Sequence, residues 1–355
     1  MVSASGMVKI FTPSYADEAD TNAQNLSVKE IVARLDPVRA AVTMLHEGPV
    51  DARIASRAHT KLLRWGKHGN TARTVAQILA NVPDVYFFPR EGPLDSAFVA
   101  LRRFLRLKTA LVTYVVSGGL DKGMYSPQRV RNIREADLVV ANNTYLAQLL
   151  KDKVGVEAGV IYDGADRRFF FPPHPRRSYR DPVTVLFAGS LRPYKRASLV
   201  VKQAVLFPET QFRIAGVGEE ESQCRALAAD LPNVECLGHL SPAQLGDEMR
   251  RASIFFFPSI LEGHPQVLVQ AAASGLPVVA MHNYRPDYVV DGTTGFLAET
   301  NEELAAKLRL LISQPELRRS MGAAALSHAQ RFEWGKIALE WQQVFEKAVT
   351  IRRRN

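Results

Sequence analysis

Residues 254–280 contain the side chains of this chain that are best placed for chemistry. Residues 254–257 form a continuous apolar run that ends at Pro258, which is typical of a strand covered on both faces of a parallel sheet. A loop then leads to Pro265, which suits the first turn of a helix, and Gly275 suits the end of that helix. Ligands of open parallel sheets bind beyond the carboxyl ends of the strands, and phosphates bind at helix N-termini. Glu262, in the loop, is therefore predicted to face a ligand.

Other strand ends in the second half of the chain suit a nucleoside diphosphate. The loop after residues 183–188 offers a glycine, a hydroxyl and several cations suited to neutralising phosphate charge: Gly189, Ser190, Arg192, Lys195 and Arg196. Gly216 and Gly218 permit close backbone approach, the segment ending at His239 offers backbone groups for a base, and Gln270 offers a hydroxyl-binding group. A glycine after a strand is usually only a turn, so the prediction depends on the order and spacing of all these features together.

Length and composition restrict the class of protein. A chain of 355 residues favours two domains, and an apolar content of 46% indicates a globular protein. Its two cysteines, Cys224 and Cys236, form no disulfide framework and favour a reducing, cytoplasmic compartment. Residues 1–6 do not resemble a secretory signal, and the longest apolar stretches are strand-sized, so no membrane-spanning helix is expected. The histidines and carboxylates show no metal-ligand spacing, so we expect neither a metal nor a cofactor.

Positive charge is concentrated in the first half of the chain. Residues 1–180 contain 26 Lys and Arg against 17 Asp and Glu, whereas residues 181–355 contain 19 of each. Such a region suits an anionic lipid surface, an acidic acceptor or nucleic acid, although a solvated face is equally compatible with it. Leu62, Leu63 and Trp65, inside the basic run, favour peripheral contact with an anionic membrane. No nucleic-acid-binding module accompanies the charge, so a nucleic-acid partner is not expected.

Strand and helix patterns alternate along both halves, which predicts doubly wound parallel sheets. The expected strands are residues 8–11, 41–44, 85–88, 110–116, 138–141, a strand that begins at Val160, residues 183–188, 211–215, 233–237 and 254–257, and a last strand that ends at Ala280. The expected helices are residues 25–35, 70–80, 94–105, 127–135, 197–206, 219–230, a helix after Pro315, and residues 334–350. The intervening segment 172–182 is rich in Pro and Arg and is predicted to link two Rossmann-like domains, residues 1–171 and 183–330, that face each other across a cleft.

These motifs resemble those of the retaining GT-B glycosyltransferases of glycosyltransferase family 4, most strongly over residues 161–345. Residues 162–172 resemble the family's linker entry, residues 187–195 its phosphate loop, and residues 214–218 its glycine turn. Glu262 and Gln270 resemble its signature of two glutamates separated by seven residues. Residues 292–297 match the family's turn after the next strand. Residues 331–355 are expected to contain the terminal helix that crosses back to the N-terminal domain.

The resemblance implies a reaction and roles for the site residues. The N-terminal domain would bind the acceptor, and the C-terminal domain would bind a nucleotide-diphosphate sugar. Glu262 would bind a sugar hydroxyl, the backbone of Gly263 and His264 would hold the sugar or the distal phosphate, and Gln270 would reach the ribose. Lys195 would offset the charge that develops on the leaving group. A sugar would then pass, with retention and without a metal, to a glycan, lipid or lipid-linked acceptor.

Three departures from the family pattern must be weighed, because they bear on whether the protein is active. Gln270 replaces the second glutamate and loses its charge-assisted hydrogen bonds. Ser190 replaces the usual arginine, leaving Arg192 or Arg196 to compensate. Ser117, followed by Gly118 and Gly119 on the predicted acceptor side of the cleft, stands where the family often has a histidine. The alternatives are a nucleotide-sugar epimerase or related enzyme on the same fold, or a nucleotide-sugar binding protein that has lost activity. The side chain of His264 is expected to lie in an exposed loop.

Overall fold

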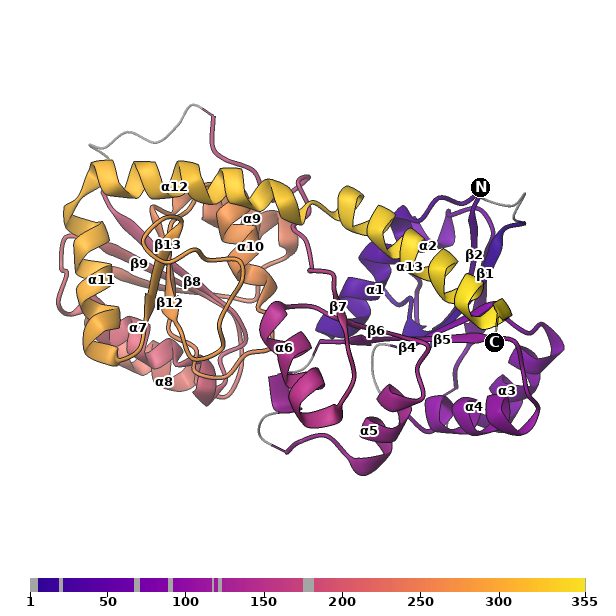
Figure 1. Ribbon diagram of the computed structural model, residues 1–355. Helices are drawn as coiled ribbons and strands as arrows, with labels where there is room; N and C mark the ends of the chain where they lie inside the picture. Colours follow the sequence, from indigo (N-terminus) through magenta and orange to yellow (C-terminus); the bar gives the residue numbers. More distant parts are fainter. Residues whose placement is uncertain are drawn as a thin grey trace. The chain divides into compact units, whose positions relative to one another are not determined.

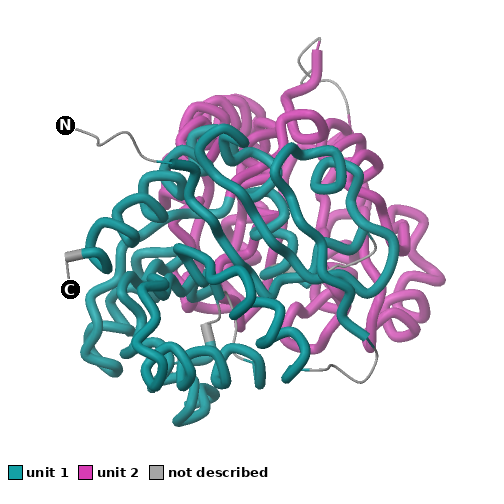
Figure 2. Tube along the Cα trace, turned by 90° about the vertical axis from the view of Figure 1, so that its right-hand side faces the viewer, with its two compact units in different colours: residues 1–163, 334–355 teal, residues 164–333 magenta. Residues whose placement is uncertain are grey.

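The computed structural model describes residues 6–18, 22–66, 71–88, 92–116, 118–120, 123–174 and 182–354 (Figure 1). These residues form two compact units (Figure 2). Unit 1 contains residues Met1–Asp163 and Trp334–Asn355, and unit 2 contains Gly164–Glu333. Within the described ranges, no helix is both long and apolar enough to cross a membrane.

Unit 1 is built on a seven-stranded sheet in the order β3-β2-β1-β4-β5-β6-β7. Its strands are β1 (Val8–Tyr15), β2 (Ala40–His46), β3 (Thr60–Arg64), β4 (Val85–Phe88), β5 (Ala110–Val115), β6 (Leu138–Ala141) and β7 (Gly159–Val160). Every neighbouring pair is parallel. Because β1 lies between β2 and β4, the chain leaves β1 in one direction and later returns to its other side. The carboxyl ends of β1 and β4 therefore form a switch point of the sheet.

Helices cover both faces of this sheet. They are α1 (Ala23–Arg34), α2 (Ala52–Ala55), α3 (Thr71–Ala80), α4 (Pro93–Phe104), α5 (Pro127–Arg134), α6 (Thr144–Leu149) and α13 (Trp334–Arg354). α1 and α13 contribute to one hydrophobic cluster, while α3 and α4 contribute to another. Trp341 of α13 is fully buried, and its ring centroid lies 4.9 Å from those of both Phe87 and Tyr114. The last helix of the chain is thus part of the core of the first unit.

Unit 2 repeats the architecture with six parallel strands in the order β10-β9-β8-β11-β12-β13. They are β8 (Thr184–Ala188), β9 (Gln211–Ala215), β10 (Val234–Gly238), β11 (Ile254–Phe257), β12 (Val278–Met281) and β13 (Gly295–Ala298). Its helices are α7 (Ala197–Ala204), α8 (Glu221–Ala228), α9 (Pro242–Arg251), α10 (Gln266–Ala273), α11 (Asn301–Ser313) and α12 (Pro315–Ala329). All four residues of β11 are completely buried, as expected for a central strand of a covered parallel sheet.

The structure differs from the sequence-based expectations at several points. Strands β3 and β13 and helices α2, α6, α9 and α11 were not predicted. The expected domain boundary at residues 171/172 lies too late, since Gly164 already belongs to unit 2. Phe169 is held there through its carbonyl oxygen, which accepts a hydrogen bond of 2.8 Å from Arg250 of α9. Most of the predicted linker, residues 175–181, lies outside the described residues.

Leu62, Leu63 and Trp65, the residues that favoured membrane contact, take part in the packing of unit 1. Leu62 and Leu63 belong to strand β3, which pairs with β2 at the edge of the sheet. Leu63 is buried, and Leu62 and Trp65 pack against the two hydrophobic clusters of unit 1. Much of their apolar surface is therefore used inside the unit, and contact with a membrane stays a prediction.

Candidate functional site

The candidate site of unit 2 lies at the switch point of its sheet. β8 and β11 are neighbours, but the chain runs outward from β8 to β9 and β10 and from β11 to β12 and β13. The loops that leave β8 and β11 therefore begin side by side and diverge, which creates the crevice where open α/β sheets bind ligands. Lys195 lies in the loop after β8, and Glu262 lies in the loop after β11.

Lys195 and Glu262 form an ion pair with each other. The Nζ of Lys195 lies 2.6 Å from Oε1 of Glu262, and the two side chains are only 14% and 9% exposed. The hydroxyl of Ser259 donates a 2.6 Å hydrogen bond to the same oxygen. The ammonium group also lies 5.1 Å from the ring centroid of Phe257, a cation–π distance. A ligand group that pairs with the Lys195 ammonium or with the Glu262 carboxylate must therefore break the ion pair between them.

Hydrogen bonds hold three loops together around this pair. The N–H of Ile260 donates to the carbonyl oxygen of Tyr194 at 3.0 Å, which joins the loop after β11 to the loop after β8. The side-chain amide of Asn283, after β12, donates to the carbonyl oxygen of Ile260 at 2.6 Å. The main chain around Lys195 and Glu262 is thus held in place by hydrogen bonds within the unit, as a pre-organised site requires.

Gly216 and Gly218 allow close approach of the chain to itself. A Cβ on Gly216 would lie 1.8 Å from the carbonyl oxygen of Gly189, and one on Gly218 would lie 2.8 Å from that of Leu191. Both glycines have positive φ, 138° and 151°. The N–H of Leu191 also donates to the carbonyl oxygen of Val217 at 2.9 Å. The two glycines therefore allow the loop after β9 to pack directly against the main chain of the predicted phosphate loop.

The cations of the phosphate loop differ in their availability. Arg196 adopts a left-handed conformation with φ of 60°. Its guanidinium donates to the carbonyl oxygen of Pro258 at 3.3 Å and to the side chain of Asn301. These bonds join the loop to β11 and α11, so Arg196 has a framework role. Arg192 and Ser190 are exposed on the loop, which leaves Arg192 as the better placed of the two candidates to compensate for the missing arginine.

His264 is buried, so the expectation of an exposed side chain is wrong. It is 6% exposed, and its ring stacks on Tyr288 with centroids 3.7 Å apart. Burial lowers the pKa of His264 to about 3, so the ring is neutral near pH 7. Tyr288 belongs to the loop between β12 and β13, and no local pattern around His264 indicated this packing.

Gln270 lies in the second turn of α10, which begins just beyond Gly263 and His264. Pro265 is the N-cap of that helix, one position before the expected place. The Oε1 atom of Gln270 is buried and has no hydrogen-bond partner in the described part of the chain. A buried amide oxygen without a partner favours a ligand hydroxyl or N–H at this position.

Three polar residues of this region were not predicted to belong to the site. The hydroxyl of Ser259 donates to Glu262, and its place just after the apolar run 254–257 was the feature that could have indicated it. The hydroxyl of Tyr284 is buried, and burial, followed by the Glu262 carboxylate, raises the pKa of Tyr284 well above its usual range. Glu220 lies at the start of the expected helix 219–230, and its carboxylate accepts hydrogen bonds from the N–H of Ala197 and the hydroxyl of Ser198 at the start of α7.

Other predicted site residues are less informative. His239 is exposed after β10. Ser117 lies outside the described residues, while Gly118 and Gly119 begin a short 3₁₀ helix. A Cβ on Gly119 would lie 2.9 Å from the Cβ of Met124, so local packing alone explains this glycine. The acceptor role of these three residues stays a prediction.

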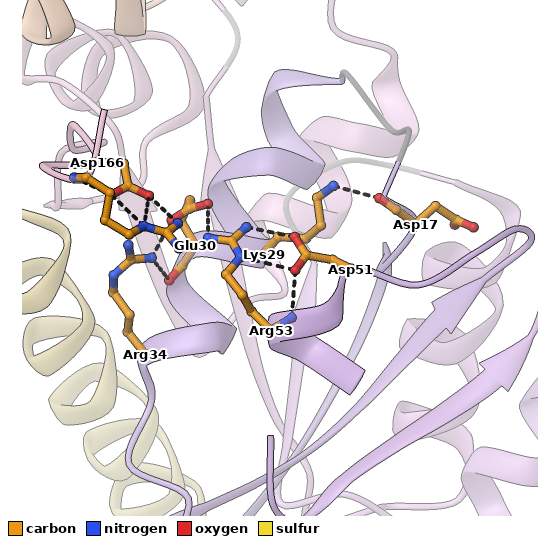
Figure 3. Close-up of polar contacts among 8 residues, drawn as sticks. Asp17, Lys29, Glu30, Arg34, Asp51, Arg53 and Asp166 are labelled. Atoms are coloured by element: carbon orange, nitrogen blue, oxygen red, sulfur yellow. Dashed lines mark hydrogen bonds and ion pairs between the residues drawn. The ribbon is translucent and has the colours of Figure 1, made fainter. Parts of the chain in front are cut away.

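Unit 1 has a polar network around the loops after β1 and β2 (Figure 3). The carboxylate of Asp17 accepts hydrogen bonds from the N–H groups of Glu47 and Gly48. Lys29 of α1 is almost completely buried and donates to the carbonyl oxygen of Asp17 at 2.6 Å. Arg53 lies 2.7 Å from both the Asp51 and Glu30 carboxylates. The network fixes the carboxyl edge of β1 and β2 to α1.

Comparison with known proteins agrees with this architecture. Residues 173–328 match the family described as glycosyl transferases group 1. The structure is similar to sucrose-phosphate synthase from Thermosynechococcus elongatus, with a TM-score of 0.80 and 18% identity over 96% of this chain and 98% of that chain. It is also similar to HepE from Anabaena, solved in complex with UDP-glucose, with a TM-score of 0.75 and 18% identity over 96% of this chain and all of that one. The fold is therefore GT-B, and the predicted pair of doubly wound parallel sheets is confirmed.

The sequence is similar to that of a D-inositol 3-phosphate glycosyltransferase from Streptomyces scabiei. The two are 32% identical over 257 residues, which represent 62% of this chain and 56% of that enzyme. The chain spans between 54% and 60% of the length of the first curated relatives that it matches.

Proposed function

We propose that this protein is a retaining glycosyltransferase that moves a sugar from a nucleoside-diphosphate sugar to a glycan, lipid or lipid-linked acceptor, without a metal. The Lys195–Glu262 ion pair is the observation that carries the proposal. It lies at the switch point of the unit whose sequence matches group 1 glycosyl transferases. A solved relative by fold binds UDP-glucose, which favours a uridine nucleotide as the first donor to examine.

Donor binding would proceed by exchange of partners within the pair. The diphosphate is dianionic or more, so it competes with the single carboxylate for the Lys195 ammonium. Glu262 is then released to accept hydrogen bonds from sugar hydroxyls, while Ser259 keeps its carboxylate oriented. Lys195 stabilises the charge that develops on the leaving diphosphate. The unpartnered oxygen of Gln270 suits a ribose hydroxyl.

The exchange predicts different effects for the two residues. Glu262→Ala should bind UDP at least as tightly as the wild type, because Lys195 no longer has a competing partner, yet it should lose sugar transfer. Lys195→Ala should lose both. Thermal stabilisation by UDP measures binding, and UDP release from UDP-sugars in the presence of acceptors measures transfer. Glu209→Ala, an exposed carboxylate between α7 and β9, is the matched control and should behave as the wild type. Equal transfer by wild type and Glu262→Ala would refute the proposed role.

Two alternatives stay open, and the departures from the family pattern motivate one of them. A nucleotide-sugar binding protein without activity is favoured by Ser190 and Gln270, and it predicts a thermal shift with nucleotide but no turnover with any donor. An epimerase or related enzyme predicts a changed sugar without acceptor consumption. Product analysis by NMR distinguishes these outcomes and also determines whether the anomeric configuration is retained.

A further inference from the structure

The carboxylate of Glu220 lies at the first turn of α7, the helix that follows the phosphate loop. Arg196 precedes this helix in a left-handed conformation, and its side chain does not cap the helix. Oε2 of Glu220 instead accepts a 3.0 Å hydrogen bond from the N–H of Ala197, and Oε1 accepts one of 2.9 Å from the hydroxyl of Ser198. A helix N-terminus attracts an anion, and here the anion is a carboxylate from another loop of the same unit.

The main chain of Glu220 binds the other end of the same loop. Its N–H donates to the carbonyl oxygen of Leu191 at 2.7 Å. Glu220 stands directly before α8, which lies side by side with α7 (Figure 1). The segment from Leu191 to Ala197 is thus held at both ends by one residue. Lys195, the cation that pairs with Glu262, lies within this segment.

The charge of Glu220 suits a role within the protein rather than contact with a donor. Burial lowers the pKa of Arg196, and the negative charge of Glu220 opposes that lowering. Both carboxylate oxygens of Glu220 already accept hydrogen bonds from the start of α7. A carboxylate also repels the phosphates of a donor at short range. Any effect of Glu220 on a bound diphosphate therefore passes through the loop that it holds.

We propose that Glu220 is a positioning residue for the phosphate loop that carries Lys195. By holding both ends of residues 191–197, it keeps the Lys195 ammonium at the place where the diphosphate of the donor binds. A loop that is fixed before binding loses less conformational entropy when the ligand arrives, so the ligand binds more tightly. This role rests on the function proposed above, because it requires a diphosphate at Lys195.

The neighbouring carboxylate of Glu219 provides a matched control. Glu219 is exposed, and its side chain has no hydrogen bond or ion pair within the part of the chain that the structure describes. Removing either carboxylate makes the same change in net charge beside the loop. Electrostatics alone therefore predicts that Glu219→Ala and Glu220→Ala both bind an anion at least as tightly as the wild type. The positioning role predicts the opposite sign for Glu220→Ala.

Calorimetric titration of the full chain with UDP measures the effect. Glu220→Ala should bind UDP about tenfold more weakly than the wild type, since the released loop must be ordered on binding, whereas Glu219→Ala should bind it at least as tightly as the wild type. Glu220→Gln keeps one acceptor oxygen and should lie between wild type and Glu220→Ala. Ser198→Ala, which removes one of the two donors, should weaken binding about threefold. Uridine has no phosphate to reach the loop, so its affinity, measured by NMR titration, should be the same for all these proteins.

Two results would overturn the positioning role. One is UDP binding by Glu220→Ala that equals or exceeds that of the wild type. The other is equal weakening for UDP and uridine, which would indicate a general loss of structure in unit 2. In both cases, UDP binding and sugar transfer by the wild type would leave the proposed function standing, whereas a wild type that does not bind UDP would remove both. Far-UV circular dichroism establishes that each variant is folded, and Glu220→Gln and Ser198→Ala carry the same test if Glu220→Ala does not fold.

Discussion

The burial of His264 predicts a loss of stability of unit 2 in mild acid. In the unfolded chain the imidazole takes up a proton near its ordinary pKa of 6.5, whereas in the folded unit burial lowers the pKa of His264 to about 3. The unfolded state therefore binds the proton first as the pH falls. The stabilisation from this group is fully present above pH 6.5 and is lost progressively between pH 6.5 and pH 3.

The magnitude follows from the two pKa values. Each pH unit below 6.5 costs about 1.4 kcal/mol, so between pH 7 and pH 5 this single group lowers the free energy of unfolding by about 2 kcal/mol. That is a large part of the stability of a typical domain. His264→Phe is the informative change, because it keeps an aromatic ring against Tyr288 but cannot titrate.

Hydrogen exchange of peptides from α10 and β12 at pH 7 and pH 5 measures the free energy of unfolding of unit 2. Wild type should lose about 2 kcal/mol more than His264→Phe over this interval. All three tryptophans, Trp65, Trp334 and Trp341, lie in unit 1, so urea unfolding followed by tryptophan fluorescence is an internal control. Unit 1 should show the same pH dependence in both proteins. An identical pH dependence of unit 2 in wild type and variant would refute the reasoning.

Three further predictions concern single contacts. Lys195→Ala and Glu262→Ala should each lower the free energy of unfolding of unit 2, because each single change leaves a largely buried charge without its partner. The double variant should lose about 1–3 kcal/mol less than the sum of the two single losses. Additive losses, measured by unfolding followed with far-UV circular dichroism, would contradict a stabilising ion pair. Gly216→Ala should cost more than about 3 kcal/mol, since its Cβ would overlap the Gly189 carbonyl, whereas Gly292→Ala, also at positive φ but in open space, should cost about 1 kcal/mol in the same assay. Trp341→Ala should lower the stability of unit 1 by about 3–5 kcal/mol in urea unfolding, against less than about 0.5 kcal/mol for the exposed Leu339→Ala.

Much of the fold was readable from local sequence patterns. The strands at residues 85–88, 138–141, 211–215 and 254–257 were predicted at their observed bounds, because a strand buried on both faces shows a continuous apolar run. Edge strand β3 was not recognised, since among the described residues it pairs only with β2, and its two adjacent leucines, Leu62 and Leu63, lie between Lys61 and Arg64 without a continuous apolar run. Helix α9 had a readable signal that was overlooked, with Pro242 in its first turn and a capping box formed by Ser241 and Gln244.

The sequence by itself determined which chemical groups stand at the carboxyl ends of the strands of unit 2. A glycine turn, a lysine loop and a carboxylate before a helix are local features, and their order along the chain was enough to predict a phosphate-binding edge. Only the tertiary structure decided which of these groups meet. The strand order makes β8 and β11 neighbours and so pairs Lys195 with Glu262. Tertiary packing also directs the Arg196 guanidinium to the carbonyl oxygen of Pro258 and buries His264 against Tyr288. The reason is physical: periodicity reports the local face that a residue buries, whereas contacts between distant loops depend on sheet order and on long-range packing.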